Sequence, residues 1–339
     1  MKAAIYRGPG NVSIESLADP APGPSEVVVQ VAYSGICGTD LHLVHLPAVK
    51  PEEGDVMGHE VVGEIVEIGQ GVDRSRVGEA VALEHLLSCM SCEFCNEGHI
   101  NLCRNSTYFM GRDITGGNAQ YIRVYDTMAV PVPGLSLREA ALAEPLAVAY
   151  QGVAFSGIKE GESALVVGCG PIGALTIQVL KAFGVQPIVS EISPYRLQLA
   201  SKLGAAVTVN PMKDDLEAAV KKYAGETGVR YVFECTGSAK AYAQVMPLLR
   251  SAGTLMMVGS GPDAIPVVPE TMLRRQLTIK GSLAYADRMA NAIELLQRGV
   301  IEVDTLISAE RPLEDWYTSV GELSSGGDLC KVLIKPSLS

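Results

Sequence analysis

The sequence predicts an α/β protein with two domains, an all-β barrel-like unit followed by a doubly wound parallel sheet. Three observations lead to this prediction. The first 130 or so residues alternate short β-like runs with glycine and proline. From Ser163 onward, continuous apolar runs are separated by amphipathic helical segments, which is typical of a parallel sheet covered on both faces. Six such runs are present, the number that a dinucleotide-binding fold requires.

The N-terminal part contains four clear strand candidates, which are rich in β-branched residues and bounded by turn residues: Lys2–Tyr6, Glu26–Tyr33, Gly63–Ile68 and Ala119–Val124. A Pro-Val-Pro-Gly segment at 131–134 then marks a break. An alanine-rich run over Ser136–Ala154 follows, and we expect it to form a helix.

The second part supplies the strands of the parallel sheet, at Ser163–Val167, Pro187–Ser190, Ala206–Val209, Arg230–Glu234, Thr254–Val258 and Leu277–Lys280. Its first helix is expected over Ile172–Phe183, where Gly184 is a good terminator. A further helix over Arg288–Arg298 and a terminal strand at Lys331–Ile334 complete the chain.

Composition limits the function. The chain has 339 residues, 47% of them hydrophobic, and a net charge of −11, which argues against nucleic acid and anionic membranes as partners. We find no uninterrupted apolar run near the roughly 18 residues of a membrane span and no N-terminal leader pattern. Four of the eight cysteines crowd into one short segment. That is metal-ligand spacing in a reducing compartment, so we expect a cytoplasmic protein.

The chemistry is expected near two short segments, Gly35–His42 and Gly58–Glu60. They offer sulfur, imidazole nitrogen and carboxylate, the ligand types that zinc accepts, in Cys37, His59 and Glu60. A catalytic zinc needs about three protein ligands and one open position. Nearby groups could orient a ligand or move a proton: Thr39, Asp40 and His42. The alternative is a buried cysteine with two ordinary loop histidines.

A second metal site is indicated by the pattern C-x2-C-x2-C-x7-C at Cys89, Cys92, Cys95 and Cys103. Four thiolates can close a tetrahedron around one zinc and leave no position for a substrate, so this site would be structural. An iron–sulfur cluster also takes four cysteines, although its usual spacings differ. His99 lies within this lobe and is surplus to a four-thiolate site.

A nucleotide site is predicted by the glycine pattern Gly168-Cys169-Gly170-Pro171-Ile172-Gly173, which follows a predicted strand and opens a helix. Such glycines let the backbone approach a pyrophosphate at the helix N-terminus. Glu191 ends the next strand, where a carboxylate accepts hydrogen bonds from ribose hydroxyls and repels a 2′-phosphate. We therefore expect NAD rather than NADP, although Arg196 nearby could hold a phosphate. A glycine turn without a ligand is the alternative.

Together these patterns resemble the zinc-containing medium-chain dehydrogenases over nearly the whole chain. The resemblance implies an α/β protein with a GroES-like β-barrel catalytic domain at 1–147, which includes a structural-zinc lobe at about 85–105. It implies a Rossmann doubly wound parallel sheet for NAD at 148–285 and a return to the catalytic domain at 286–339.

The resemblance also implies roles for single residues. Cys37 and His59 match catalytic zinc ligands, and Thr39 and His42 match a proton relay. Two zinc ions per chain are implied, the second held by the four-cysteine lobe. Besides the fingerprint glycines, Pro171, Ile172, Glu191 and Arg196, the cofactor is expected to contact two further strand ends, at Cys235, Thr236, Val258 and Gly259.

The third zinc ligand points to one branch of the family. Liver-type alcohol dehydrogenases have a cysteine where this chain has Glu144, and the Glu-Pro-Leu segment resembles the polyol, butanediol, threonine and sugar-acid dehydrogenases. In that branch the residue matching Glu60 or the one matching Glu144 can be the direct ligand, and both remain possible here.

The expected activity is therefore reversible, zinc-dependent oxidation of a secondary alcohol to a ketone with NAD, in a homodimer or homotetramer as in relatives. Substrate contacts are expected among residues that lie near the substrate in related enzymes: His45, His85, Tyr108, Arg112 and Tyr285. A non-catalytic NAD-binding redox sensor or scaffold of the same fold is the alternative. A zinc-independent quinone reductase fits poorly, because such relatives lack the cysteine lobe.

Overall fold

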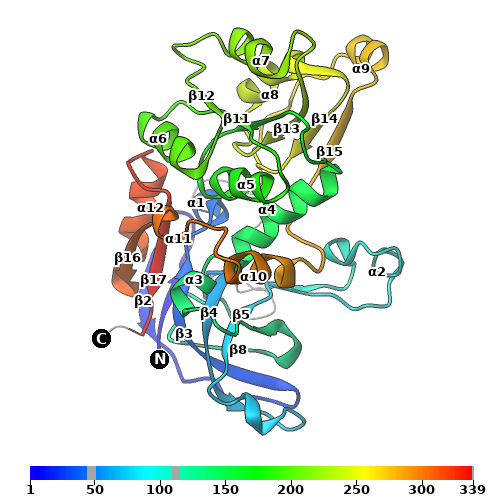
Figure 1. Cartoon of the computed structure of the whole chain (residues 1–339). Helices are drawn as coiled ribbons and strands as arrows, with labels where there is room; N and C mark the ends of the chain where they lie inside the picture. The colour runs from blue at the N-terminus through cyan, green and yellow to red at the C-terminus, as the bar shows by residue number, and fades with distance from the viewer. Residues whose placement is uncertain (44–50, 109–114, 338–339) are drawn as a thin grey trace. The chain divides into compact units, whose positions relative to one another are not determined.

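The structure is a computed structural model that describes residues 1–43, 51–108 and 115–337 (Figure 1). The chain divides into two compact units, each described here by itself. Unit 1 contains Met1–Glu144, Met289–Gly299 and Ile307–Ser339. Unit 2 contains Pro145–Arg288 and Val300–Leu306.

Unit 2 is built on a six-stranded sheet with the order β12-β11-β10-β13-β14-β15, in which every neighbouring pair is parallel. Its strands are β10 (Ala164–Val167), β11 (Ile188–Ser190), β12 (Val207–Val209), β13 (Val229–Glu234), β14 (Leu249–Met257) and β15 (Thr278–Gly281). The order reverses between β10 and β13. This is the topology of dinucleotide-binding folds, whose ligands lie beyond the carboxyl ends of the strands at the switch point.

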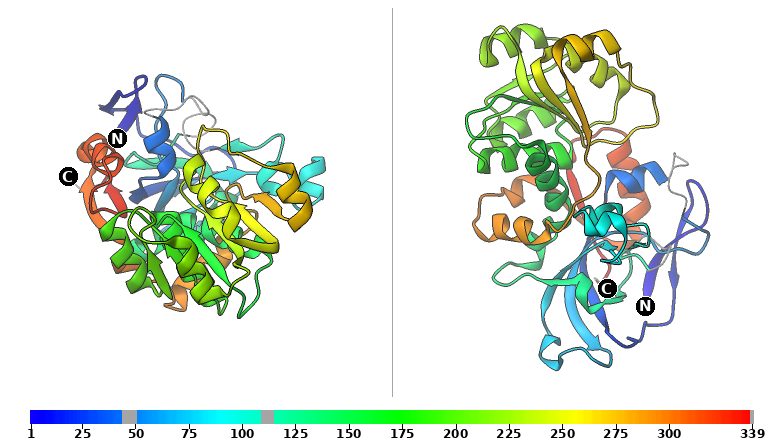
Figure 2. Two further views of the ribbon diagram at one scale, coloured as in Figure 1. Left: turned by 90° about the horizontal axis from the view of Figure 1, so that it is seen from above. Right: turned by 90° about the vertical axis from the view of Figure 1, so that its right-hand side faces the viewer.

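Helices lie on both faces of this sheet (Figures 1 and 2). They are α5 (Pro171–Ala182), α6 (Pro194–Leu203), α7 (Leu216–Ala224), α8 (Ala239–Val245) and α9 (Pro269–Arg275). Because both faces are covered, β10 is buried at every position. The predicted alternation of apolar strands and amphipathic helices is confirmed in this unit, where α5 begins one residue before the predicted helix.

Unit 1 is built on a seven-stranded sheet with the order β16-β17-β3-β4-β5-β9, and β8 pairs with β3. The strands are β3 (Glu26–Gly35), β4 (Glu60–Ile68), β5 (Ala80–Leu83), β8 (Tyr121–Tyr125), β9 (Ala129–Pro131), β16 (Ile307–Pro312) and β17 (Lys331–Lys335). Two further pairs are antiparallel, β1 (Lys2–Tyr6) with β2 (Val12–Ser16) and β6 (Leu86–Leu87) with β7 (Thr107–Tyr108). Valines and isoleucines of β3, β4, β5 and β8 form the core of this sheet.

The end of the chain returns to unit 1. Strand β17 pairs antiparallel with β3, so that Leu333 faces Gly35. The other helices of this unit are α1 (Gly38–Leu43), α2 (Glu93–Asn96), α10 (Met289–Gln297) and α12 (Trp316–Ser324), while α11 (Val303–Leu306) belongs to unit 2. Trp316 is 1% exposed and packs with Val332 and Ile334 of β17. Residues far apart in sequence therefore share one core.

The predicted continuous helix over Ser136–Ala154 was wrong. The structure has a short helix α3 (Leu137–Ala140) and a separate helix α4 (Ala143–Ser156). Pro145 explains the break. It has no N–H to donate to the carbonyl of Ala141, and its ring would clash with that carbonyl in a continuous helix, whereas proline is tolerated in the first turn of a new helix. The break puts Glu144 at the start of α4.

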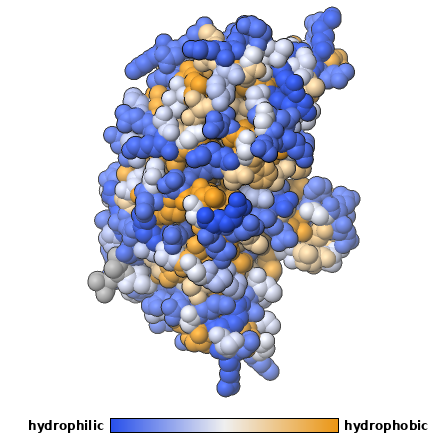
Figure 3. Space-filling view, in the orientation of Figure 1, coloured by the Kyte–Doolittle hydropathy of each residue, from blue (hydrophilic) through white to orange (hydrophobic). Residues whose placement is uncertain are grey.

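Hydrophilic residues cover much of the surface seen in Figure 3, as expected for helices that bury one side. Among the residues that the structure describes, no helix has the length and apolar character needed to cross a membrane.

Candidate active site

Local structure brings the first three candidate ligands together. Cys37 lies two residues after the end of β3, and His59 directly precedes the first residue of β4. The antiparallel register pairs Gly35 with Glu60, so the two chemically active segments meet at one end of the hairpin. One ligand atom from each of Cys37, His59 and Glu60 lies within 4.8 Å of the others.

Gly58 allows this arrangement. Its φ is +99°, and a side chain there would come within 2.8 Å of the backbone nitrogen of Asn118. Because L-residues rarely adopt this conformation and no space remains for a Cβ, glycine is required immediately before His59.

Asp40 could orient His59 by accepting a hydrogen bond from its free ring N–H, or it could cap a turn, and the structure shows the turn cap. Its Oδ2 accepts a hydrogen bond from the backbone N–H of Cys37 at 2.9 Å. Neither its Oδ1 nor the Nδ1 atom of His59 has a hydrogen-bond partner among the described residues, although both atoms are buried. Asp40 therefore acts as a turn cap for the Cys37 loop, and burial raises the pKa of its carboxyl group.

The two candidate carboxylates have different basic partners. Glu60 forms an ion pair with Lys331 of β17, and these side chains are 2% and 1% exposed. Glu144 lies with its Oε1 atom 3.1 Å from Nδ1 of His85. Burial raises the pKa of Glu60. Burial also acts to raise the pKa of Glu144, but the hydrogen bond that Glu144 accepts from His85 helps to lower this pKa below its ordinary value.

Lys331 is the residue that the sequence analysis missed. Its Nζ atom donates a hydrogen bond to the carbonyl oxygen of Ile36 at 2.9 Å, next to Cys37. In the sequence it is only the first residue of an apolar strand, where a lysine side chain is expected to be exposed to solvent. A fully buried lysine needs a paired acid, which here comes from a strand more than 250 residues earlier.

These donors fit a cation. Burial lowers the pKa of His59, but its interactions with Cys37, Glu144 and Asp40 outweigh this effect and raise the pKa to about 10. Surroundings that favour a positive charge on the imidazole would also favour a bound cation. A buried imidazole nitrogen without a partner, beside a thiol and a carboxylate, is suited to a zinc ion. Thr39 lies at the edge of the group, where its Oγ1 accepts from the Cys37 thiol at 3.5 Å.

The four cysteines of the lobe also converge. Their sulfur atoms lie within 4.8 Å of one another, with Sγ–Sγ distances of 3.5 Å between Cys92 and Cys95 and 3.9 Å between Cys92 and Cys103. Tetrahedral ligation at about 2.3 Å puts sulfurs roughly 3.8 Å apart, so the spacing suits zinc. Hydrogen bonds from Ser91 lower the pKa of Cys89 to about 5, which favours the thiolate. His99 is exposed.

The predicted nucleotide residues gather at the carboxyl edge of the unit 2 sheet. Gly168, Cys235 and Val258 directly follow the neighbouring strands β10, β13 and β14. Thr236 and Gly259 come next in sequence. Gly170 is the N-cap of α5 and Pro171 is its first residue. Among the described residues, the only heavy atom within 4 Å of a Cβ at Gly170 would be Nη1 of Arg196, at 4.0 Å, so space remains for a phosphate.

Glu191 connects this glycine loop to the end of β11. Its Oε2 atom accepts from the backbone N–H of Cys169 at 2.7 Å, and Oε1 accepts from Ile192 and Ser193. Each carboxylate oxygen has two lone pairs, so one acceptor site, on Oε2, remains for a ribose hydroxyl. These residues fit a dinucleotide.

Not every predicted residue can be assessed. His45 and Arg112 lie outside the described residues, and the side chains of His42 and Tyr108 are not described. Tyr285 is buried in unit 2, at 3% exposure. His85 lies close to the candidate ligands, with its ring centroid 6.0 Å from that of His59.

Comparisons with known proteins agree with this geometry. Residues 23–134 match the alcohol dehydrogenase GroES-like domain, and residues 171–298 match a zinc-binding dehydrogenase domain. The chain is 30% identical to sorbitol dehydrogenase of Bacillus subtilis, covering 99% of this chain and 98% of the relative. It is 33% identical to (R,R)-butanediol dehydrogenase of the same organism, covering 99% and 100%.

Solved structures give the same result. The crystal structure of 2R,3R-butanediol dehydrogenase from Bacillus subtilis has a TM-score of 0.91 and 32% identity, covering 99% of both chains. A zinc-binding dehydrogenase from Sinorhizobium meliloti bound to NADP has a TM-score of 0.92 and 33% identity, again covering 99% of both.

The chain belongs to the zinc-containing medium-chain dehydrogenase family. The predicted fold class, a GroES-like barrel with a Rossmann sheet, is confirmed. It is an oxidoreductase of the zinc-type alcohol and polyol dehydrogenases, which act on CH–OH groups with a nicotinamide nucleotide.

Proposed function

We propose that the chain oxidises a secondary alcohol in a polyol, vicinal diol, sugar or sugar acid to a ketone, with NAD as hydride acceptor. The observation that carries this proposal is the group of Cys37, His59 and Glu60, with Glu144 held beside it. Glu144 stands where liver-type enzymes have a third cysteine, and sorbitol and butanediol dehydrogenases are among the relatives at 30% identity or more.

Cys37, His59 and Glu60 would hold the catalytic zinc. A zinc ion there would act as a Lewis acid on the alcohol oxygen and lower the pKa of the hydroxyl group. Glu60 uses its Oε2 atom for Lys331, and its second oxygen remains for the metal. Glu144, which pairs with His85 and is not one of the three grouped ligands, would accept a hydrogen bond from water or substrate.

Thr39 would accept the substrate hydroxyl proton and pass it towards His42 and solvent. Its hydroxyl oxygen lies 3.5 Å from the Cys37 sulfur. The dinucleotide would supply the hydride acceptor, held by the glycine loop of Gly168, Gly170 and Gly173 and by Glu191. The Glu191 carboxylate favours NAD, since it would repel a 2′-phosphate.

The test combines a substrate panel with two histidine variants. Secondary alcohols, hexitols, vicinal diols and sugar acids are assayed for reduction of NAD and of NADP. His59→Ala should lose the catalytic zinc and turnover, and so should Cys37→Ser. His99→Ala, a change at an exposed histidine beside the cysteine lobe, should keep both.

Two outcomes oppose the proposal. Full turnover in His59→Ala would remove the metal site from catalysis. Zinc binding without reduction of NAD or NADP by any substrate would favour the alternative, a non-catalytic redox sensor or scaffold.

We also propose that the chain binds two zinc ions, forms a dimer or tetramer, and lies in the cytoplasm. The proposed functional domains are the catalytic domain at 1–147, the NAD-binding domain at 148–285, and the return to the catalytic domain at 286–339.

A further inference from the structure

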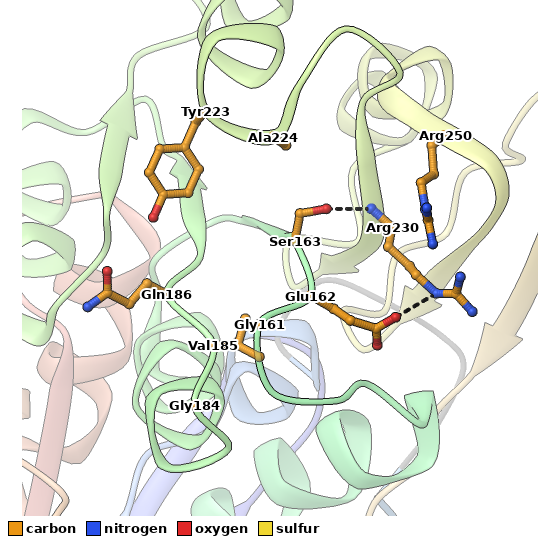
Figure 4. Close-up of a pocket in the computed structure, with 10 residues that line it drawn as sticks. All are labelled: Gly161, Glu162, Ser163, Gly184, Val185, Gln186, Tyr223, Ala224, Arg230 and Arg250. Carbon is orange, nitrogen blue, oxygen red and sulfur yellow. Dashed lines mark hydrogen bonds and ion pairs between the residues drawn. The ribbon is translucent and has the colours of Figure 1, made fainter.

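A cavity of about 600 Å³ lies at the amino-terminal edge of the unit 2 sheet, the edge opposite the glycine fingerprint (Figure 4). Its walls come from the segments that enter four strands: 161–163 before β10, 184–186 before β11, and Arg230 and Arg250 at the starts of β13 and β14. Tyr223 and Ala224 at the end of α7 complete the lining. The cavity belongs to unit 2 alone and is separate from the nucleotide residues.

Two arginines but only one acid line this cavity. The acid, Glu162, is already engaged, since its Oε1 atom pairs with Nε of Arg230 at 3.0 Å and its Oε2 atom accepts from the N–H of Lys159 at 2.8 Å. Figure 4 shows both guanidinium groups on one side of the cavity, with Tyr223 and Gln186 on the other. The charged groups that line the cavity are therefore net positive, in a chain whose net charge is −11.

The side chain of Arg250 has no hydrogen-bond or ion-pair partner among the described residues, and its Nε atom is buried. A buried N–H without a partner is unfavourable because it has lost its hydrogen bonds to water, and more so in a charged group. Arg230 lies with its guanidinium carbon 5.6 Å from the centre of the Tyr231 ring, a stacked position that leaves its terminal nitrogens available.

The backbone carries Arg250 out of the regular sheet. Val229 pairs with Leu249 and Tyr231 with Thr254, so residues 250–253 bulge opposite Arg230 alone. Such a bulge changes the direction of a side chain, and here Arg250 becomes a lining residue of the cavity.

We propose that this cavity binds a small oxyanion, a phosphate or carboxylate group of a metabolite, between the guanidinium groups of Arg230 and Arg250. Arginine forks match both groups through paired N–H donors. Tyr223 and Gln186 would contact the rest of the ligand, and a volume of this size suits a small molecule. Glu162 positions Arg230 and does not bind the ligand.

The experiment is calorimetric titration of the full chain with inorganic phosphate and, separately, with malonate. We expect binding that weakens at least about tenfold in Arg250→Gln, because a hydrogen bond to a charged group contributes about 1.5–3 kcal/mol. Arg250→Lys keeps the charge but loses the fork, and should bind with intermediate affinity. Arg274→Gln is the matched control, since Arg274 is exposed in the same unit and pairs with Glu270.

The two titrants distinguish the source of the oxyanion, a phosphorylated or a carboxylated metabolite. Thermal unfolding without titrant checks that each variant is folded. Equal binding in Arg250→Gln and the unchanged protein would overturn the proposal, because phosphate at the glycine fingerprint would survive this change. Equal weakening in Arg274→Gln, or no binding of either probe, would also overturn it.

Discussion

Lys331 is a buried residue that joins the segments of the proposed metal site. It is 1% exposed, pairs with Glu60 and donates to the carbonyl oxygen of Ile36, so it connects the β3 and β4 segments that carry the candidate ligands. Glu60 raises the pKa of Lys331, although burial opposes this, so the lysine stays charged. Both side chains of the pair are buried, so removal of one partner would leave an uncompensated buried charge on the other.

Lys331→Met should therefore destabilise the metal-free protein by about 3–5 kcal/mol. The loss should be smaller in the zinc-loaded protein, because the metal would compensate the charge of Glu60. Denaturant unfolding with and without a chelator measures both values.

Lys335→Met is the matched control on the same strand. Lys335 is 28% exposed and pairs with Glu310 at the surface, so its removal should cost less than about 1 kcal/mol. Equal losses for Lys331→Met in the metal-free and zinc-loaded states would show that Glu60 does not approach the metal.

At the scale of the element, the turn between β10 and α5 depends on close backbone packing. A Cβ on Gly173 would overlap the carbonyl oxygen of Gly168. Gly173→Ala should destabilise unit 2 by about 1–3 kcal/mol and weaken binding of NAD. Gly321 in α12 has open space around it, so Gly321→Ala should instead stabilise the protein by about 0.5–1 kcal/mol. Thermal unfolding and fluorescence titration with NADH measure these effects, and unchanged NADH affinity in Gly173→Ala would contradict the predicted loop.

Glu191 belongs to the same element through its hydrogen bond to Cys169. Glu191→Gln removes the negative charge and keeps the size, so it should lower the ratio of kcat/KM for NAD to that for NADP by roughly tenfold, about 1.4 kcal/mol. Steady-state rates with both cofactors test this prediction. An unchanged ratio would mean that repulsion by Glu191 does not select the cofactor.

For the whole molecule, we expect the small cysteine lobe to depend on a bound metal ion for its stability. Cys95 and Cys103 are its buried thiols, and the lobe contributes short elements such as α2. Cys92→Ser should lower the zinc content from about two to about one per chain and reduce the thermal stability.

Elemental analysis of the purified variant measures this loss. Cys235→Ser provides a cysteine control outside the lobe, and it should keep the full zinc content. A variant at Cys92 with unchanged zinc would show that the four thiols do not hold a metal.

The two-part fold, the glycine fingerprint and the cysteine lobe could all be predicted from the amino-acid sequence alone. Each depends on a local pattern of hydrophobic residues, glycines or cysteines that spans at most a few tens of residues. The sequence also indicated Cys37, His59 and Glu60 through the ligand types that zinc accepts, and Glu144 through a family resemblance. It did not predict the break at Pro145, because the alanine-rich composition around it favours one helix.

Two features became visible only in the folded chain. One is the lysine that supports the candidate metal ligands, and the other is the pair of arginine side chains that line a cavity in unit 2. Lys331 reaches Glu60 because β17 pairs with β3 from the far end of the chain. Arg230 and Arg250 line one cavity because β13 and β14 are adjacent and one of them bulges. Buried ion pairs and shared cavities depend on contacts between distant segments, and no local spacing in the sequence records them.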